Sequence, residues 1–259
     1  MHSLLKNHFE VQTGMYFDYF TTYGNWMISM SNIIEDSFWN YAVIPENCNL
    51  EKELPVVEEI LRRASRPLSV YVINEKDHSD YISCLLKHGY NKVSEESFMT
   101  YDSRYRKDAI HEEMDVIRAI QKSEMEDFID VFMGAYGGEI TPEQPYGELD
   151  KTYVDALTKS FENTEKFYHY ICRFNGKPVA IASLCFENKN GGIYNVGTNP
   201  SNRGCGYGTL ATIACIKKWI DLGGKTLFLQ TETGSKVESW YYSLGFKLDF
   251  YGSTYCKEE

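Results

Sequence analysis

Three glycines on alternate positions follow an arginine in the stretch NPSNRGCGYG, residues 199–208. They are Gly204, Gly206 and Gly208, and the arginine is Arg203. Glycine lets a backbone approach a ligand without an obstructing Cβ. Backbone N–H groups at the start of a helix bind anions, because they lack partners within the helix and the helix dipole adds positive charge. The pattern predicts a phosphate-binding loop if a helix follows, and a glycine-rich tight turn is the alternative reading.

Two common phosphate-binding motifs do not fit this stretch. The dinucleotide fingerprint G-x-G-x-x-G needs glycine where Thr209 stands, and it belongs to an early βαβ unit rather than the last quarter of a chain. The P-loop needs lysine and then Ser or Thr after its last glycine, and no lysine follows Gly208. A nucleotide-binding protein therefore stays an alternative that thermal protection of the chain by ATP or NAD would support.

The elements expected around the stretch place it between a strand and a long helix. Asn175-Gly176 is a strong hairpin turn, and Ser123 and Ser235 are expected to cap helices. A strand–helix–strand crossover makes the flanking strands parallel, so the loop lies where the first strand ends and the helix begins. The expected elements are strands at 168–174, 179–187, 191–198, 225–231 and 246–252, and helices at 122–138, 206–224 and 235–245.

The motif R-x-x-G-x-G, formed here by residues 203–208, resembles the GNAT superfamily of acyl-CoA-dependent N-acetyltransferases. Upstream, IYNVGTNPSNRG is similar to the family's strand and proline-containing loop. Downstream, ESWYYSLGFK is similar to the family's closing helix, and the spacing between the blocks also matches. The resemblance covers residues 168–250 and implies an α/β fold with a mixed sheet, with acetyl-CoA as co-substrate and no metal.

The resemblance also implies a role for each block. The backbone amides of the loop would hold the pyrophosphate, and the end of the preceding strand would pair with the pantetheine arm, with the Val196 amide polarising the thioester carbonyl. The implied coenzyme-binding residues are Val196, Gly197, Thr198, Arg203, Gly204, Cys205, Gly206, Tyr207, Gly208 and Thr209. An acyl-cysteine on Cys205 is conceivable, but the loop directs its amides to phosphate rather than to the thioester.

Tyr241 stands at the family's frequent general-acid position, where a phenol can protonate the departing thiolate. The other reading of Tyr241 is a member of an aromatic stripe at a helix end. The attacking amine must be neutral, and some family members use a glutamate on the strand before the loop. Gly191 and Gly192 occupy that slot here, which leaves Glu187, Glu232 or a water relay as candidate bases.

The first half carries a possible repeat of the last quarter. Residues 68–99 can be aligned with residues 225–255, since both run strand, loop, helix, Gly-aromatic and strand. Leu85 takes the place of Tyr241, and no R-x-x-G-x-G precedes it. We expect a tandem architecture with a degenerate GNAT-like or accessory domain at 1–110 and a catalytic domain at 111–259, and coincidence between two common patterns is the alternative.

Composition limits the possible partners. The net charge of −11 disfavours general nucleic-acid binding, and no apolar run is long enough for a membrane span. The seven cysteines show no C-x-x-C pair and no His/Cys cluster with zinc spacing, so reduced thiols and a cytoplasmic location are expected. The sequence predicts acetyl transfer to a small-molecule or peptide amine. The alternative is a non-catalytic acyl-CoA sensor or adaptor, and the oligomeric state stays open.

Overall fold

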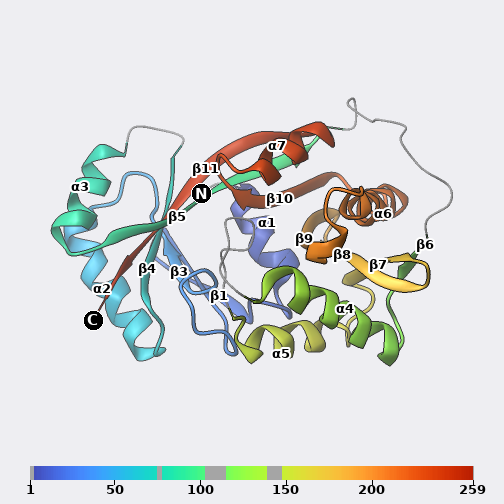
Figure 1. Ribbon diagram of the computed structural model, residues 1–259. Coiled ribbons are helices and arrows are strands. Elements are labelled where there is room, and N and C mark those ends of the chain that lie inside the picture. The colour runs from blue at the N-terminus through green and yellow to red at the C-terminus, as the bar shows by residue number, and fades with distance from the viewer. Residues whose placement is uncertain (1–2, 75–77, 103–114, 139–147, 259) are drawn as a thin grey trace. The chain divides into compact units, whose positions relative to one another are not determined.

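The computed structural model describes residues 3–74, 78–102, 115–138 and 148–258 (Figure 1). The chain divides into two compact units, which are described separately. Unit 1 comprises residues 1–100 and 230–259, and unit 2 comprises residues 101–229. No helix within the described ranges is long and apolar enough to cross a membrane.

Unit 1 is a set of strands with three helices of the N-terminal half and one helix near the C-terminus. Its strands follow the order β1-β2-β3-β4-β11-β5. Its elements are α1 (Ser3–Gln12), β1 (Tyr19–Tyr23), β2 (Trp26–Met30), β3 (Tyr41–Val43), α2 (Leu50–Arg63), β4 (Leu68–Ile73), α3 (Ser79–Lys87), β5 (Asn91–Tyr101, whose last residue belongs to unit 2), α7 (Lys236–Ser243) and β11 (Phe246–Lys257).

Unit 2 carries the glycine-rich loop. Its strands follow the order β10-β9-β8-β7-β6, and Figure 1 shows α4 and α6 on opposite sides of them. Its elements are β6 (Asp115–Arg118), α4 (Lys122–Tyr136), α5 (Lys151–Ser160), β7 (Phe167–Phe174), β8 (Lys177–Glu187), β9 (Asn190–Thr198), a 3₁₀ turn (Pro200–Asn202), α6 (Tyr207–Asp221) and β10 (Thr226–Glu232), which continues into unit 1.

Local signals explain most of the element boundaries. Asn175 and Gly176 both have positive φ, at 50° and 75°, as a two-residue hairpin turn between β7 and β8 requires. The side chain of Ser235 accepts a hydrogen bond from the Glu238 amide at 3.0 Å, which confirms the predicted cap of α7. The predicted cap of α4 is wrong, because Ser123 lies inside the helix and Gln121 forms the capping box with Glu124.

The expected order of strand, helix and strand is present in both stretches, as β4, α3 and β5 and as β10, α7 and β11, and the tandem architecture stays a prediction. The predicted domain boundary at 110/111 falls among residues 103–114, outside the described residues. The compact units do not follow that boundary, because β11 pairs antiparallel with β4, with Gly252 opposite Ile73 and Lys257 opposite Leu68. The C-terminal strand thereby joins residues 230–259 to the first unit.

Candidate coenzyme-binding site

The glycine-rich loop connects β9 to α6 through a left-handed backbone. Gly204 and Gly206 have φ values of 78° and 86°, a region that other residues adopt at a cost. No heavy atom lies within 4 Å of where a Cβ would stand on either glycine, so both open onto solvent. Gly208 is different, because its Cβ would lie 3.0 Å from the Thr198 hydroxyl oxygen. The start of α6 therefore packs closely on the end of β9.

The loop presents unpaired backbone amides at the N-terminus of α6. Among the described residues, none accepts a hydrogen bond from the amides of residues 204–208, and the Leu210 amide donates to Gly206 at 3.1 Å. Gly206 caps the helix without a side-chain bond, and the first turn carries no acidic residue. Unpaired N–H groups and the positive end of a 15-residue helix dipole favour an anion at this position.

The side chains of the loop do not share this role. The Cys205 thiol is exposed, and its sulfur lies 3.8 Å from the carbonyl oxygen of Arg203, two positions earlier in the chain. The Tyr207 ring is buried and packs against Phe174, with a centroid distance of 5.6 Å, and against the core around Cys172. The sequence prediction for Cys205 and Tyr207 therefore concerns their amides.

The Arg203 side chain links the loop to neighbouring backbone. Its guanidinium donates to the Ala135 carbonyl at 3.1 Å and to the Thr198 carbonyl at 3.4 Å. Ala135 lies in the last turn of α4, where the helix dipole favours a cation. The geometry makes Arg203 a positioning residue that joins the loop to α4 and to the end of β9.

Strand β9 parts from β10 before it reaches the loop. The two strands pair in parallel from Asn190–Thr226 to Ile193–Leu229, and beyond this β9 pairs only with β8 within unit 2. The β8–β9 register shifts where Ile181 and Ser183 face Gly197 and Tyr194, so β9 carries a bulge of one extra residue. Such a divergence leaves strand backbone available to a ligand.

The bulge places Val196 half-buried and opposite no residue of β8. Its carbonyl accepts a hydrogen bond from the Tyr136 hydroxyl at 2.8 Å, a contact that the sequence did not reveal. Gly197 follows, and its missing Cβ leaves room for the Ala135 methyl group, which would otherwise lie at 2.8 Å. The last turn of α4 therefore supports the strand segment predicted to meet the pantetheine arm.

A buried line of polar side chains holds the bulge from its other side. The Asn195 amide donates to the Ser183 hydroxyl at 3.1 Å, and that hydroxyl lies 2.8 Å from Nδ1 of His169. Nε2 of His169 lies 2.9 Å from the Ser160 hydroxyl, which donates to the Leu157 carbonyl at 2.6 Å. Since Ser160 spends its proton on that carbonyl, it accepts from Nε2–H, and Ser183 donates to Nδ1.

This line needs a neutral imidazole. Burial, and secondarily the charge of Arg118, lowers the pKa of His169 to about 3. Asn195 itself has a φ of 53°, which non-glycine residues seldom adopt and which Asn tolerates better than most. The side-chain amide of Asn195 bonds to Ser183, which His169 holds in turn, and these two hydrogen bonds keep Asn195 in its strained conformation. Sequence reasoning missed this line, because its members are far apart in the chain.

The remaining predicted residues lie elsewhere. Glu187 pairs with Lys166 at 3.0 Å and stands opposite Asn190, at the end of β9 away from the loop. Tyr241 is buried in α7 of unit 1, where its ring lies 4.6 Å from that of Trp240. Glu232 ends β10 in the same unit and is exposed. The structure gathers Val196–Thr198 with residues 203–209 and does not bring Glu187 to them.

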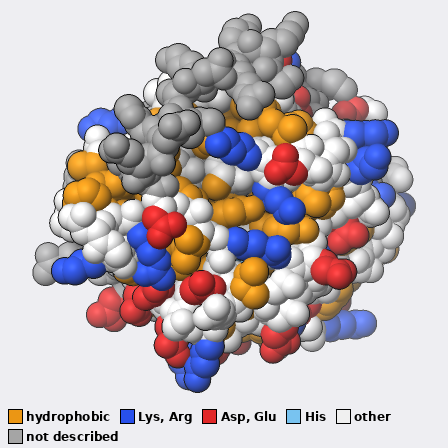
Figure 2. All heavy atoms as spheres, turned by 90° about the vertical axis from the view of Figure 1, so that its right-hand side faces the viewer, with side chains coloured by type: hydrophobic (Ala, Val, Ile, Leu, Met, Phe, Trp, Pro, Cys, Tyr) orange, Lys and Arg blue, Asp and Glu red, His pale blue; other side chains and the backbone are white. Residues whose placement is uncertain are grey.

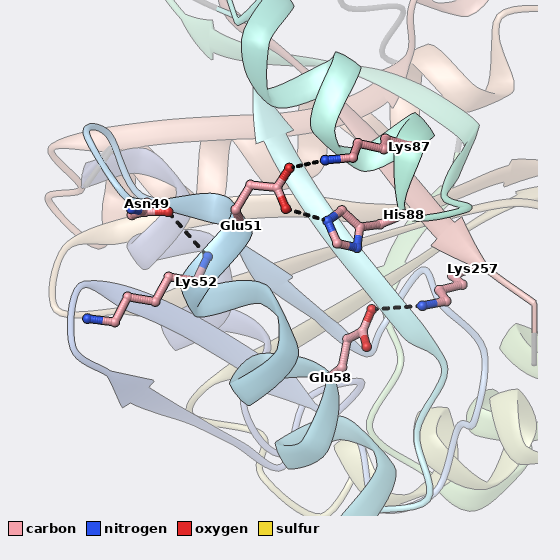
Figure 3. A network of polar contacts seen from close by, with 7 residues as sticks. All are labelled: Asn49, Glu51, Lys52, Glu58, Lys87, His88 and Lys257. Atoms are coloured by element: carbon pink, nitrogen blue, oxygen red, sulfur yellow. Dashed lines mark hydrogen bonds and ion pairs between the residues drawn. The ribbon is translucent and has the colours of Figure 1, made fainter.

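One group of potential metal ligands also went unnoticed in the sequence. Glu51, Cys84 and His88 have ligand atoms within 4.8 Å of one another, with Cys84 and His88 four positions apart. Figure 3 shows that Glu51 already pairs with Lys87 at 2.8 Å and with His88 at 2.9 Å. These hydrogen bonds, that of Lys87 first, lower the pKa of Glu51 to about 2. The ion pairs account for the cluster as a link between α2 and α3, and the expected absence of a metal stays a prediction.

Positive charge gathers locally although the net charge is −11. Figure 2 shows a face on which Lys and Arg side chains lie among hydrophobic side chains, with Asp and Glu side chains on the same face. In unit 2, Arg118 and Lys218 both lie over the Tyr168 ring, at 4.2 and 5.0 Å from its centroid. The acidic composition of the chain therefore leaves room for an anionic ligand.

Comparisons with known proteins agree with this geometry. Residues 125–246 match the sequence model of the acetyltransferase (GNAT) family. No curated protein matches the sequence. A GCN5-related N-acetyltransferase from Kribbella flavida has a similar fold, with a TM-score of 0.72, 16% identity, and coverage of 99% of this chain and 95% of that one.

Two further solved structures share the fold at low identity. A functionally unknown conserved protein from Staphylococcus epidermidis gives a TM-score of 0.66 and 13% identity, and the match covers 92% of this chain and 93% of that one. A tandem GNAT protein from the clavulanic acid biosynthesis pathway gives 0.58 and 10%, with 89% of this chain and 77% of that one covered. The mixed α/β fold of the GNAT type is thereby established.

Proposed function

We propose that this protein transfers an acetyl group from acetyl-CoA to a primary amine, because residues 125–246 match the sequence model of the acetyltransferase (GNAT) family. The observation that carries the proposal is the loop at 203–208, in which the backbone amides of residues 204–208 have no described hydrogen-bond acceptor. These amides lie at the N-terminus of α6, beside the divergence of β9 from β10. The bound coenzyme would supply an acetyl thioester, which is an activated acyl donor.

The residues present fit that co-substrate. The open space over Gly204 and Gly206 lets a pyrophosphate approach the loop amides, where a side chain would obstruct it. Beyond the last β9–β10 pair, Val196, Gly197 and Thr198 would offer backbone groups to the pantetheine arm. The Val196 amide would polarise the carbonyl of the thioester. Arg203 would hold the loop in place through its two carbonyl contacts.

Proton transfer is the less constrained part of the proposal. Tyr241 would act as general acid toward the departing thiolate. The acceptor amine must lose a proton, and of the two candidate carboxylates Glu232 is retained. Glu187 is the poorer base, because Lys166 neutralises it at the far end of β9. A chain of water molecules would serve equally.

The direct test is turnover on a panel of amines, including polyamines, amino acids and peptide N-termini. Acetylated amine should be measured by mass spectrometry, because the exposed Cys205 thiol would react with reagents that detect released CoA. The variant Tyr241→Phe keeps the ring and removes the acid, and Tyr242→Phe is the matched control on the neighbouring residue, which is 44% exposed. We expect turnover to fall at least tenfold in the first and to be unchanged in the second.

The second candidate is an acyl-CoA sensor without turnover. The observation that favours it is the absence of a carboxylate at Gly191 and Gly192, together with the burial of Tyr241. Tight acetyl-CoA binding with no acetylated product from any amine would select the sensor and reject the enzyme. All seven cysteines are free thiols, which supports the further proposal of a reducing, cytoplasmic location.

A further inference from the structure

Unit 1 contains a carboxyl group without a partner. Glu96 lies on β5 and is only 4% exposed, yet neither of its carboxyl oxygens has a hydrogen-bond partner among the described residues. Acidic residues are rarely this buried unless they are paired. Burying a carboxylate without a counter-charge costs much free energy, so such a group either takes up a proton or binds a cation.

A second orphaned polar atom lies nearby. The Tyr71 hydroxyl on β4 is buried and has no described partner. Its phenol lies over Gly252 of the neighbouring strand β11, where a Cβ would overlap the ring. The strand order is β4-β11-β5, so β11 lies between the strand of Tyr71 and the strand of Glu96. Because the Tyr71 side chain extends over β11 at Gly252, its hydroxyl points toward β5.

Aromatic faces complete the surroundings. The ring of Tyr41 on β3 lies 5.3 Å from the ring of Tyr71. Burial raises the pKa of both phenols, and the negative charge of Glu96 raises them further, so the three groups interact. Phe98, two residues after Glu96 and therefore on the same face of β5, packs against Tyr71 as well.

The charges around Glu96 do not neutralise it. Lys92 pairs with Glu95 on the same strand, and Glu232 at the end of β10 adds another negative charge. His8 of α1, which packs on Phe98, is uncharged because burial lowers its pKa to about 3. Burial first, then Glu95 and Glu232, raise the pKa of Glu96 to about 7, while the positive charge of Lys92 and a polar contact with the Ser94 side chain, which is short of hydrogen-bond geometry, act in the opposite direction.

We propose that Glu96, Tyr71 and Tyr41 form a binding site for a protonated primary amine. An ammonium group has three N–H donors, which match the two carboxyl oxygens and the phenol oxygen that lack partners. Phenol faces stabilise a cation at short range. That this amine is the acetyl acceptor rests on the proposed function, whereas amine binding itself does not.

The test uses the full chain without acyl-CoA and the probe n-butylammonium, with n-butanol as the neutral probe of similar shape. Calorimetry in two buffers with different ionisation enthalpies measures both the affinity and the protons released. Since Glu96 is mostly protonated at pH 6, we expect binding there to release close to one proton, and at pH 8 almost none. The affinity should rise about tenfold between these values.

Matched variants separate this site from general effects. Glu96→Gln should abolish both the proton release and the binding of n-butylammonium, and Tyr71→Phe should weaken binding while leaving proton release intact. Glu59→Gln is the control, because Glu59 is an exposed carboxylate on α2 of the same unit that pairs with Arg63, so binding and proton release should stay as in the wild-type chain. Equal binding of n-butylammonium by the wild-type chain and Glu96→Gln, or equal binding of n-butanol, would overturn the proposal.

The outcomes also distinguish this site from the proposed function. Butylammonium binding that depends on Glu96, with no acetyl transfer to any amine, would reject the transferase and keep the amine site. Acetyl transfer with an acceptor KM that Glu96→Gln leaves unchanged would reject Glu96 as the acceptor's partner and keep the transferase.

Discussion

Replacement of Gly206 by alanine isolates the role of the loop backbone. Gly206 has a φ of 86° and caps α6, and no atom lies within 4 Å of the position a Cβ would take. Steric collision with neighbours is therefore absent, and the whole cost of alanine is conformational, about 1–2 kcal/mol for a left-handed residue. The loop can meet this cost in two ways.

If the loop keeps its shape, the cost appears in the free energy of unfolding. If nothing holds the loop, the alanine relaxes to a right-handed conformation and acetyl-CoA must restore the original one. The cost then appears in binding, as a loss of about fivefold to thirtyfold in affinity. Calorimetric titration with acetyl-CoA measures the loss of binding free energy, and chemical denaturation measures the loss of unfolding free energy. The two losses should sum to about 1–2 kcal/mol.

Gly176→Ala is the matched control for this experiment. Gly176 has a φ of 75°, also has open space at the Cβ position, and belongs to the same unit, but it lies in the β7–β8 hairpin. It should lower stability by a similar amount and leave acetyl-CoA binding unchanged. If Gly206→Ala lost neither stability nor acetyl-CoA affinity, neither the folded loop nor its complex with the coenzyme would need the left-handed conformation at Gly206, and the reasoning would be refuted.

Three further predictions concern the supports of the site. Arg203→Gln removes two hydrogen bonds to carbonyls, so acetyl-CoA affinity should fall about threefold to tenfold by calorimetry, and unchanged affinity would reject the anchoring role. Ser183→Ala interrupts the buried polar line and should cost about 1–3 kcal/mol in denaturant titration, whereas the exposed Ser201→Ala should cost almost nothing. Because burial lowers the folded-state pKa of His169 and His8 to about 3 from 6.5, the unfolded chain binds more protons between these values. The free energy of unfolding should therefore fall as the pH drops below about 6.5, and His169→Gln should flatten that slope.

The sequence predicted best what depends on adjacent residues. The glycine-rich loop between a strand and a helix, the Asn175-Gly176 turn and the Ser235 cap each follow from a short stretch, because local backbone conformation depends strongly on residue type. The prediction that Ser123 caps α4 was wrong although it also rested on a short stretch, because Gln121 forms the capping box with Glu124 instead.

Contacts between distant residues escaped prediction. Tyr136 and Val196 are 60 positions apart, and nothing in either neighbourhood announces their hydrogen bond. The same holds for the overlap of Tyr71 with the space above Gly252, which depends on β11 pairing with β4. Glu187 looked suitable because it stands near β9 in the sequence, whereas strand direction takes it to the wrong end.

The close approach of Ala135 to Gly197 limits how this sequence can diverge. Arg203 binds the Ala135 carbonyl, which every residue type possesses, so that hydrogen bond places no demand on the side chain at 135. The size limit comes from the contact between α4 and β9, where residues 135 and 197 together leave room for a single methyl group. A larger residue at either position would push α4 outward and displace the glycine-rich loop through its hydrogen bond from Arg203. We expect lineages that keep the site to accept substitutions at 135 and 197 only as compensating pairs of small residues.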